Sequence, residues 1–259
     1  MINTWQLTEL GRSVEDMFTN LDAVFALKGE EITHDRLSDV IKIEHQNIRY
    51  YVKRYVAAGK GFRRFIGKPR IQGEWENLQW FEQCNIPTAS LIGYGFEKKW
   101  GLFKRGAIIT QEIPNTQNLE QFANQKKLLN NDLVKIISRL LATYTSKLHK
   151  HSFVHNDLKW RNVLVNDSAQ VFLIDCPLGD FWRGSMLSYR IVKDLKSLDN
   201  YAKKYLRRTQ RLRFFLDYVN SESLDSKSKK LLLQLLKRRS RRYDNQSKFR
   251  FNIKELIKY

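Results

Sequence analysis

Residues 24–56 alternate between apolar and polar side chains, a pattern typical of strands with one buried face. The alternation runs through VFALKGEEI at 24–32, VIKIEH at 40–45 and IRYYVKRYV at 48–56. The polar residues HQN at 45–47 separate the last two stretches and predict a hairpin turn. We therefore expect antiparallel strands near the start of the chain.

A helix and two more strands are predicted next. The stretch GKGFRRFIGKPR at 59–70 has the Gly and Pro content of a loop and is strongly basic. The stretch GEWENLQWFEQCN at 73–85 has helical spacing, whereas 86–97 and 106–113 are strand candidates. The first 113 residues are therefore expected to form a small, mostly antiparallel sheet interrupted by one helix.

The pattern becomes helical from Asn118. Residues 118–124 and 132–151 are predicted helices, and the second carries apolar side chains at helical spacing. Two short β-branched runs follow, NVLV at 162–165 and VFLI at 171–174, and the chain from Ser188 onward is helical and basic.

This order of elements predicts an α+β fold with two lobes. We expect a β-rich N-lobe at residues 1–113 and a mainly helical C-lobe at 114–259. A ligand would bind in the cleft between them.

Charge and cysteine usage limit the partners and the compartment. The chain has 259 residues with 46 basic and 27 acidic side chains, a net charge of +19. Residues 201–259 hold 18 basic and 5 acidic residues, so +13 of that charge lies there. Such a balance favours an anionic partner: nucleic acid, a phosphorylated sugar or a membrane surface. The distant Cys84 and Cys176 predict free thiols. Because no signal peptide or membrane span is evident, we expect a cytoplasmic protein.

The stretch VHNDLKWRNVLVNDSAQVFLID at 154–175 carries the candidate chemistry. Asp157 and Asn162 precede the predicted hairpin and Asp175 follows it, so folding the hairpin back brings all three together. Oxygen ligands of this kind suit Mg²⁺ that also binds waters and phosphate oxygens. Asn162 and Asp175 are the expected metal ligands, and Asp157 would orient a substrate hydroxyl and accept its proton. The order and intervals resemble the catalytic loop and metal-binding Asp of the protein-kinase-like fold.

A nucleotide site of this kind also needs a cation for the phosphates. Lys53 lies in mid-strand among apolar residues, and Glu74 opens the next helix, so an ion pair between them is expected. Arg54 and Glu76 are the competing choices. Residues 107–113 would connect the lobes, and adenine would bind the backbone at Glu112 to Ile113.

Two departures separate the chain from ordinary protein kinases. No G-x-G-x-x-G motif precedes Lys53, and DCP stands at 175–177, so Pro177 occupies the place of a flexible Gly. Proline stiffens this segment and argues against a movable activation loop. Only 84 residues follow Asp175, which is little room for peptide-docking machinery.

The combination of VKRY, GEWENL, NIPTASLIGYG, IITQEI, HNDLKWRNVLV and FLIDCPLGDFW resembles the lipopolysaccharide kinase family (Kdo/WaaP, InaA-like) from about residue 22 to 240. The resemblance implies an ATP-dependent bacterial kinase that phosphorylates a heptose or Kdo sugar of the lipopolysaccharide core. It places the catalytic base at Asp157, metal ligands at Asn162 and Asp175, and the phosphate-binding pair at Lys53 and Glu74.

Further residues near the motif have two readings each. Lys159 would neutralise the transferring phosphoryl group, or be a solvated loop residue. His155 is expected to brace the loop by hydrogen bonds, with a role as base as the alternative. Asp194 resembles a buried Asp that accepts N–H groups of the catalytic loop, with a surface Asp as the alternative. Four side chains either line the sugar site or, for the tryptophans, pack in the core: Trp160, Arg161, Trp182 and Arg183.

The basic C-terminal stretch KSKKLLLQLLKRRSRR also leaves two interpretations. It either contacts the anionic inner membrane or lipid-linked substrate through Lys237, Arg238, Arg239, Arg241 and Arg242, or packs as a solvated helix. Nucleic acid is not the expected partner, because no recognisable binding module accompanies the charge. The alternatives to a sugar kinase are a kinase for another small molecule or protein and an inactive kinase-fold module that docks on membranes.

Overall fold

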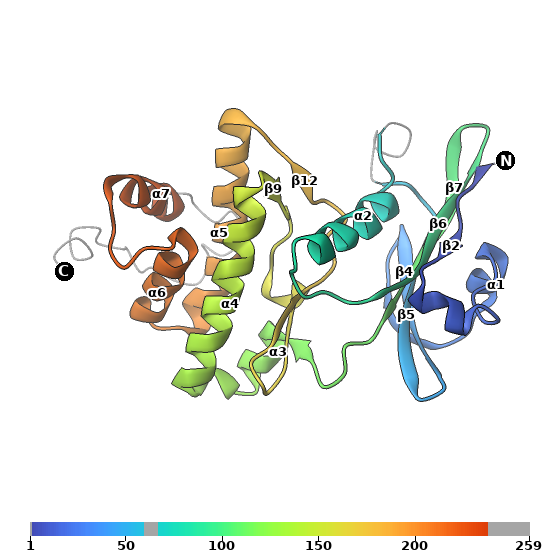
Figure 1. The fold of residues 1–259 in the computed structure, drawn as a ribbon, viewed down its shortest axis with the longest axis horizontal. Coiled ribbons are helices and arrows are strands. Elements are labelled where there is room, and N and C mark those ends of the chain that lie inside the picture. Colours follow the sequence, from blue (N-terminus) through green and yellow to red (C-terminus); the bar gives the residue numbers. More distant parts are fainter. Residues whose placement is uncertain (1, 60–66, 238–259) are drawn as a thin grey trace.

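The computed structural model describes residues 2–59 and 67–237, with a β-rich half beside a helical half (Figure 1). The β-rich half contains a 7-stranded antiparallel sheet in the order β1-β6-β7-β5-β4-β3, with β2 also paired to β6. Its strands are β1 (Ile2–Asn3), β2 (Gln6–Leu7), β3 (Glu30–His34), β4 (Ser38–His45), β5 (Ile48–Tyr55), β6 (Leu91–Lys99) and β7 (Leu102–Gln111).

Helices cover both faces of this sheet. On β7, Ile108 packs in an apolar cluster with Trp75 of α2 (Arg70–Gln83). Its neighbour Ile109 packs in a second cluster with Val24 of α1 (Leu21–Ala26), which also contains Val14 from the 3-10 helix η1 (Leu10–Val14). Successive side chains of a strand point to opposite faces, so a strand buried on both faces separates the two clusters.

The predicted hairpin is confirmed, but only the last part of the strand expected at 24–32 is extended. Gln46 and Asn47 between β4 and β5 both have positive φ, 51° and 61°, as a two-residue type I′ turn requires. Residues 24–26, expected to be extended, are helical. The side chain of Asn20 accepts a hydrogen bond from the N–H of Ala23 at 2.9 Å and so caps α1. The strand starts only at Glu30.

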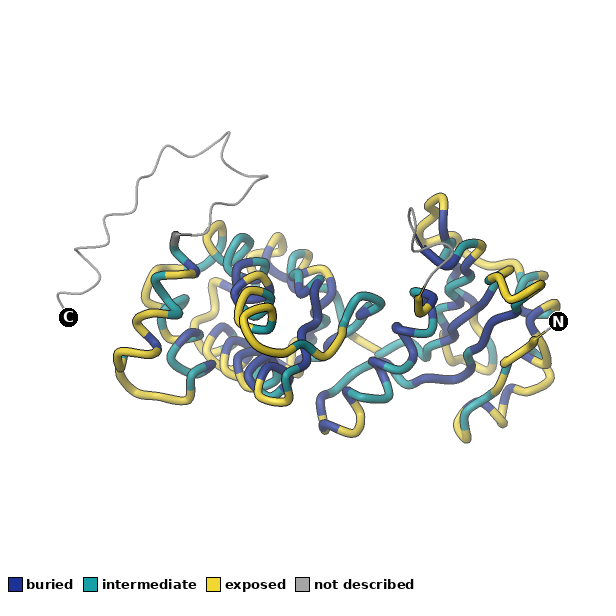
Figure 2. Tube along the Cα trace, turned by 90° about the horizontal axis from the view of Figure 1, so that it is seen from above, coloured by how far each residue is buried: buried dark blue, intermediate teal, exposed yellow. Residues whose placement is uncertain are grey.

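The second half is mainly helical, as the pattern predicts, and it also contains two small sheets. Its helices are α3 (Leu119–Asn124), η3 (Lys127–Leu129), α4 (Asn131–Lys150), η4 (Trp160–Asn162), α5 (Gly184–Tyr205), α6 (Arg208–Val219) and α7 (Ser226–Lys237). The expected hairpin forms from β10 (Val163–Val165) and β11 (Val171–Leu173), and β8 (Gln117–Asn118) extends it. A pair that the sequence did not indicate joins β9 (Phe153–Val154) to β12 (Asp180–Phe181). Figure 2 shows buried residues both in the sheet and in the helical half.

Helix α2 connects the two halves. One apolar cluster runs from Phe81 of α2 to Leu148 of α4 and Leu173 of β11. The Asn77 side chain donates to the carbonyls of Cys176 at 2.6 Å and Gly179 at 3.0 Å. Because α2 is fixed to both sides, it can hold side chains from the sheet against side chains from the helical half. We keep 113/114 as the proposed lobe boundary.

Both cysteines are buried and free, as expected. Within residues 2–59 and 67–237, no helix is long and apolar enough to cross a membrane.

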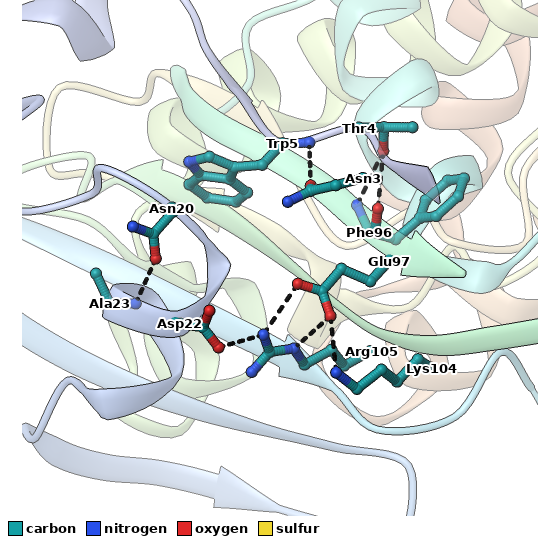
Figure 3. Close-up of polar contacts among 10 residues, drawn as sticks. All are labelled: Asn3, Thr4, Trp5, Asn20, Asp22, Ala23, Phe96, Glu97, Lys104 and Arg105. Atoms are coloured by element: carbon teal, nitrogen blue, oxygen red, sulfur yellow. Dashed lines mark hydrogen bonds and ion pairs between the residues drawn. The ribbon is translucent and has the colours of Figure 1, made fainter. Parts of the chain in front are cut away.

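Helix α1 is fastened to β6 and β7 by a charged cluster (Figure 3). Arg105 donates to the Glu97 carboxylate from Nε and Nη2, both at 2.9 Å, and Lys104 adds a contact at 3.2 Å. Arg105 also reaches Asp22 of α1 at 2.5 Å. Glu97 is only 5% exposed, and hydrogen bonding from Arg105 holds its pKa below the ordinary value.

Replacing Glu97 with Gln is expected to destabilise the fold by about 1–3 kcal/mol at pH 7, because Arg105 loses its buried charged acceptor and keeps only the exposed Asp22. A carboxyl with a lowered folded pKa stabilises above its unfolded pKa, near 4.3, and loses that effect as pH falls through the folded pKa. Urea unfolding should therefore show a wild-type advantage that is constant from pH 7 to about 5 and shrinks at lower pH. The exposed Glu9→Gln is the control; an advantage that grows in acid would contradict the assignment.

Candidate active site

A buried ion cluster lies where the sheet, α2 and the end of the β10–β11 hairpin meet. Lys53 Nζ of β5 contacts both Glu74 oxygens at 3.0 Å and Asp175 Oδ1 at 2.8 Å. Tyr55, two residues along the strand, donates its hydroxyl to Glu74 Oε2 at 2.5 Å. The expected Lys53–Glu74 pair is therefore present.

The competing residues lie elsewhere. Arg54 points to the opposite face of the sheet, where it contacts Asp39 and the carbonyls of Phe25 and Leu27. Glu76 pairs with the exposed Lys68. The alternation along β5 and the helical period of α2 thus leave Lys53 and Glu74 as the pair that faces the helical half.

The cluster carries one negative charge in excess. Burial opposes the charge of Lys53, but attraction to Glu74 and Asp175 is greater and raises the pKa of Lys53 well above its ordinary value. Burial raises the pKa of Glu74. At Asp175 burial is opposed by Lys53, and the pKa of this carboxyl is lowered. Asp175 is therefore ionised at neutral pH, with 39% of its side chain exposed and available to a cation.

Asp194 of α5 fixes the backbone of the loop that carries Asp157. It is 1% exposed and accepts the N–H groups of His155 at 2.8 Å and Asn156 at 3.3 Å, which confirms its expected place. The His155 ring differs from expectation. Neither ring nitrogen has a hydrogen-bond partner among the described residues, and the ring stacks on Phe81 at 6.0 Å. Burial lowers the pKa of His155, so this ring braces the loop as a neutral packing group.

Asp157 and Asn162 lie together at the end of the loop. Asn162 Nδ2 donates to the Asp157 carbonyl at 2.9 Å, which leaves the amide oxygen of Asn162 for another ligand. The Asn162 carbonyl accepts the N–H of Ile174 at 3.0 Å, and this bond holds the Asp157–Asn162 loop beside Asp175. Lys159 Nζ lies 2.5 Å from Asp157 Oδ1, and Arg161 lies 3.8 Å from Oδ2.

These groups fit a magnesium ion that relies on few protein ligands. The described residues contain no group of three or more His, Cys, Asp and Glu placed to hold a metal. Mg²⁺ bound beside nucleotide phosphates needs only one or two carboxylates and keeps several waters. The Asp175 carboxylate and the Asn162 amide oxygen meet that requirement.

The connection between the halves offers two backbone groups for a base. The N–H of Glu112 already donates to the Arg49 carbonyl at 2.8 Å, and the Ile113 carbonyl accepts from Thr116 at 2.7 Å. The Glu112 carbonyl and the Ile113 N–H take no part in these two hydrogen bonds. They are therefore the backbone groups that remain for the expected contact with adenine.

The turn between β3 and β4 precedes Lys53 in the place where protein kinases have the G-x-G-x-x-G loop that this sequence lacks. Asp35 Oδ1 accepts the N–H groups of Leu37 at 2.7 Å and Ser38 at 2.9 Å. An Asp side chain can close a turn in this way without glycine.

The aromatic candidates divide between core and site. Trp160 is 2% exposed and stacks between Tyr201 and Tyr205, at 6.2 and 5.5 Å, so it belongs to the core. Trp182 lies beneath the Arg190 guanidinium, 3.6 Å from the ring centre. Arg183 is exposed just before α5.

Sequence reasoning missed three residues that hold the site together. Tyr55 shares the face of Lys53 at a spacing of two, and Asn77 follows Glu74 by three on the helix, so periodicity could have found both. Arg190 Nη1 donates to Asn156 Oδ1 at 2.7 Å, across 34 residues. No spacing rule links those two.

Comparison with known proteins places this geometry in a family. The model of the Lipopolysaccharide kinase (Kdo/WaaP) family matches residues 22–219. The 3-deoxy-D-manno-octulosonic acid kinase of Vibrio cholerae serotype O1 is 26% identical over 91 residues, 33% of this chain and 37% of that protein. The probable serine/threonine-protein kinase PknB of Lactococcus lactis is 34% identical over 76 residues, 29% of this chain and 12% of that protein. The chain thus spans well under half the length of these curated relatives.

A solved structure extends the similarity to the whole fold. WaaP in complex with acyl carrier protein matches with a TM-score of 0.69 and 19% identity, over 89% of this chain and 92% of that one. The two-lobed kinase-like fold expected from the sequence is thereby confirmed. Together with the match over residues 22–219, this shows that the chain belongs to the lipopolysaccharide kinase (Kdo/WaaP) family.

Proposed function

We propose that this protein transfers the γ-phosphoryl group of ATP to a hydroxyl of a lipopolysaccharide-core sugar, heptose or Kdo. The observation that carries the proposal is one constellation. Lys53, Glu74 and Asp175 form a buried ion cluster, and Asp157 and Asn162 are held beside it by the Asn162–Ile174 hydrogen bond. Phosphoryl transfer depends mainly on positioning and electrostatic stabilisation, which this arrangement supplies.

Asp157 is the proposed catalytic base. Its carboxylate would accept the proton of the acceptor hydroxyl and orient its oxygen. Lys159 Nζ lies 2.5 Å from Asp157 Oδ1 and would neutralise this carboxylate before the reaction. During the reaction it would move toward the transferring phosphoryl group, whose negative charge it would stabilise. The backbone bonds to Asp194 keep the loop in place meanwhile.

Lys53 is the proposed phosphate ligand, and Asn162 and Asp175 are the proposed ligands of Mg²⁺. The bound ion would supply charge neutralisation on the phosphates. Because Lys53, Glu74 and Asp175 carry a net charge of −1, a divalent cation beside them is electrostatically favoured. The Glu112 carbonyl and Ile113 N–H would bind the adenine edge.

A peptide acceptor fits less well than a sugar. Residues 174–183 between β11 and α5 are pinned by Asn77 and by the β9–β12 pair. This short, fixed segment leaves little backbone for docking a peptide strand. An inactive module fits poorly too, because none of the five charged or amide groups is missing.

An apolar cavity in the helical half points to a second ligand. About 110 Å³ of space lies between α4, α5, α6 and α7, lined by Ile137, Leu198, Phe215 and Leu235 among others. Arg208 and Arg211 also line it. Apolar cavities remain dry and bind apolar groups.

We propose that this cavity takes the acyl chain of an acyl carrier protein, since the structural neighbour WaaP was solved in complex with one. Arg208 and Arg211 line the cavity together with the carboxylate of Asp199, which gives the rim a positive excess. Lys196 and Lys203 also contact Asp199. Burial and Lys203 lower the pKa of Lys196 to about 8. An acidic partner surface would complement this rim.

We propose that the protein acts on the cytoplasmic side of the inner membrane, where peripheral contact would come from the basic tail. Arg238, Arg239, Arg241 and Arg242 lie outside the described residues, and so does the side chain of Lys237.

Asp157→Ala is expected to lower phosphoryl transfer to core oligosaccharide about 100-fold or more, because the acceptor loses its base. ATP affinity, measured by calorimetry, should stay near the wild-type value. Turnover is measured as ADP release by the wild type, Asp157→Ala and the exposed control Asp167→Ala, which should behave as the wild type. Chelation of Mg²⁺ should abolish wild-type turnover. More than about a tenth of wild-type turnover in the variant would exclude Asp157 as base.

Lys53→Met is expected to weaken binding of Mg²⁺–ATP by about 10- to 100-fold, since a charged hydrogen bond contributes about 1.5–3 kcal/mol. The loss of Lys53 also leaves the buried Glu74 and the partly exposed Asp175 without their cation. Titration calorimetry should show the loss, with Lys98→Met on β6 as the matched strand lysine. Unchanged affinity would mean that Lys53 only stabilises the fold.

Ala202→Leu fills space in the cavity with a good helix former. It is expected to weaken binding of acylated carrier protein at least tenfold on an immobilised-protein sensor, because the chain loses its room. Unacylated carrier protein is the ligand control and should bind both proteins equally. Equal affinity of the wild type for the acylated and unacylated forms would remove the cavity from the interaction.

A further inference from the structure

An arginine beside the catalytic loop has donors without acceptors. Arg190 of α5 gives Nη1 to Asn156, the residue before Asp157. Its Nε is buried and has no hydrogen-bond partner, and no carboxylate among the described residues lies within ion-pair distance of this guanidinium. A guanidinium carries five N–H donors, so most of its capacity is unused.

The surroundings hold this guanidinium in one position. Asn156 is 8% exposed, has a left-handed φ of 65° and donates Nδ2 to the Leu178 carbonyl at 2.7 Å. The Trp182 ring lies 3.6 Å from the Arg190 guanidinium carbon and supports its flat face. Trp182 Nε1 is a second buried donor without a partner among the described residues. An arginine fixed on both sides is prepared for a ligand at low entropic cost.

An anion is the ligand that such a pair requires. Guanidinium binds carboxylate or phosphate through two parallel hydrogen bonds. An indole N–H can donate a third, and the ring face suits the apolar side of a sugar. Lys159 and Arg161 contact Asp157, so their charges are already engaged.

We propose that Arg190 and Trp182 form a specificity subsite that binds a carboxylate or phosphate on the acceptor sugar while Asp157 faces the acceptor hydroxyl. The subsite rests on the proposed kinase function and adds the residues that select the acceptor. Because Arg190 also holds Asn156, occupancy of the subsite and the position of the catalytic loop are linked through one hydrogen bond.

The kinetic test compares charged and neutral acceptors. The methyl glycoside of 3-deoxy-D-manno-octulosonic acid and a heptose monophosphate supply the carboxylate and phosphate arms. The carboxyl-reduced glycoside and the unphosphorylated heptose are their neutral controls. Arg190→Gln should raise KM for a charged acceptor about 10- to 100-fold more than for the neutral one, because any effect that acts through Asn156 falls on both acceptors alike. Arg190→Lys should fall between, and the exposed Arg213→Gln on α6 should match wild type. The acceptor whose KM rises in Arg190→Gln, the carboxylate or the phosphate, identifies the anion that the subsite binds.

An equal loss on charged and neutral acceptors would overturn the proposal, since it would mean that Arg190 acts only through Asn156. An unchanged KM for both would overturn it as well.

A binding test without turnover separates this proposal from the kinase function. The indole N–H signal of Trp182, assigned by its absence in Trp182→Phe, should shift when the charged glycosides are added to the wild type without ATP. It should not shift with the neutral glycosides or in Arg190→Gln. A wild type that phosphorylates neither sugar but shows this shift would refute the proposed acceptor alone. A Trp182 signal that ignores every charged probe would refute the subsite.

Discussion

The structure depends on the charge balance of Lys53 with Glu74 and Asp175. A strand, a helix and the end of a hairpin each contribute one member, and none of these charges would be stable if buried alone. The ion pairs therefore fix β5, α2 and the β11 end relative to one another. Since the three charges sum to −1, the same balance that holds the halves together leaves a place for a cation. In the proposed function, the three side chains that stabilise the fold would also supply the affinity for a phosphate-bound metal.

The catalytic loop is held by a second buried carboxylate that acts on backbone. Asp194 accepts the N–H groups of His155 and Asn156, so the loop is fixed without using the side chain of Asp157. His149 and Tyr218 extend this network: the imidazole lies 3.6 Å from Asp194 and 2.9 Å from the Tyr218 hydroxyl. The loop is thereby connected to α4 and α6 as well as α5. The Asp157 carboxylate takes no part in fixing the loop backbone and contacts Lys159 and Arg161 instead.

The sequence was informative where a residue's role follows from periodicity. The place of Lys53 in mid-strand among apolar residues, with Glu74 at the start of the next helix, predicted that the two meet, and the apolar repeat predicted α4 within one residue at each end. Prediction failed where a single hydrogen bond or pairing outside the local pattern determines the conformation. Residues 24–26 turn helical because of the Asn20 cap, and β1 and β2, two residues each, are set by pairing with β6. The Arg190–Asn156 bond joins an exposed-looking helix position to a loop, and no local pattern encodes it.

The segment after Asp175 shows how this chain replaces a movable loop with a fixed one. Asp175 has a φ of 55°, a left-handed conformation that Asp tolerates better than most residues. The next turn is held by Asn77, and a Cβ at Gly179 would come within 2.5 Å of Cys176 Sγ and Phe153. On α2, a Cβ at Gly73 would lie 2.9 Å from the Pro177 carbonyl. These close approaches, together with the ring of Pro177, leave the segment little freedom. In the proposed function, Asp175 would therefore be presented to Mg²⁺ without a switching step, and the proposed acceptor subsite of Trp182 and Arg190 follows this fixed segment in the chain.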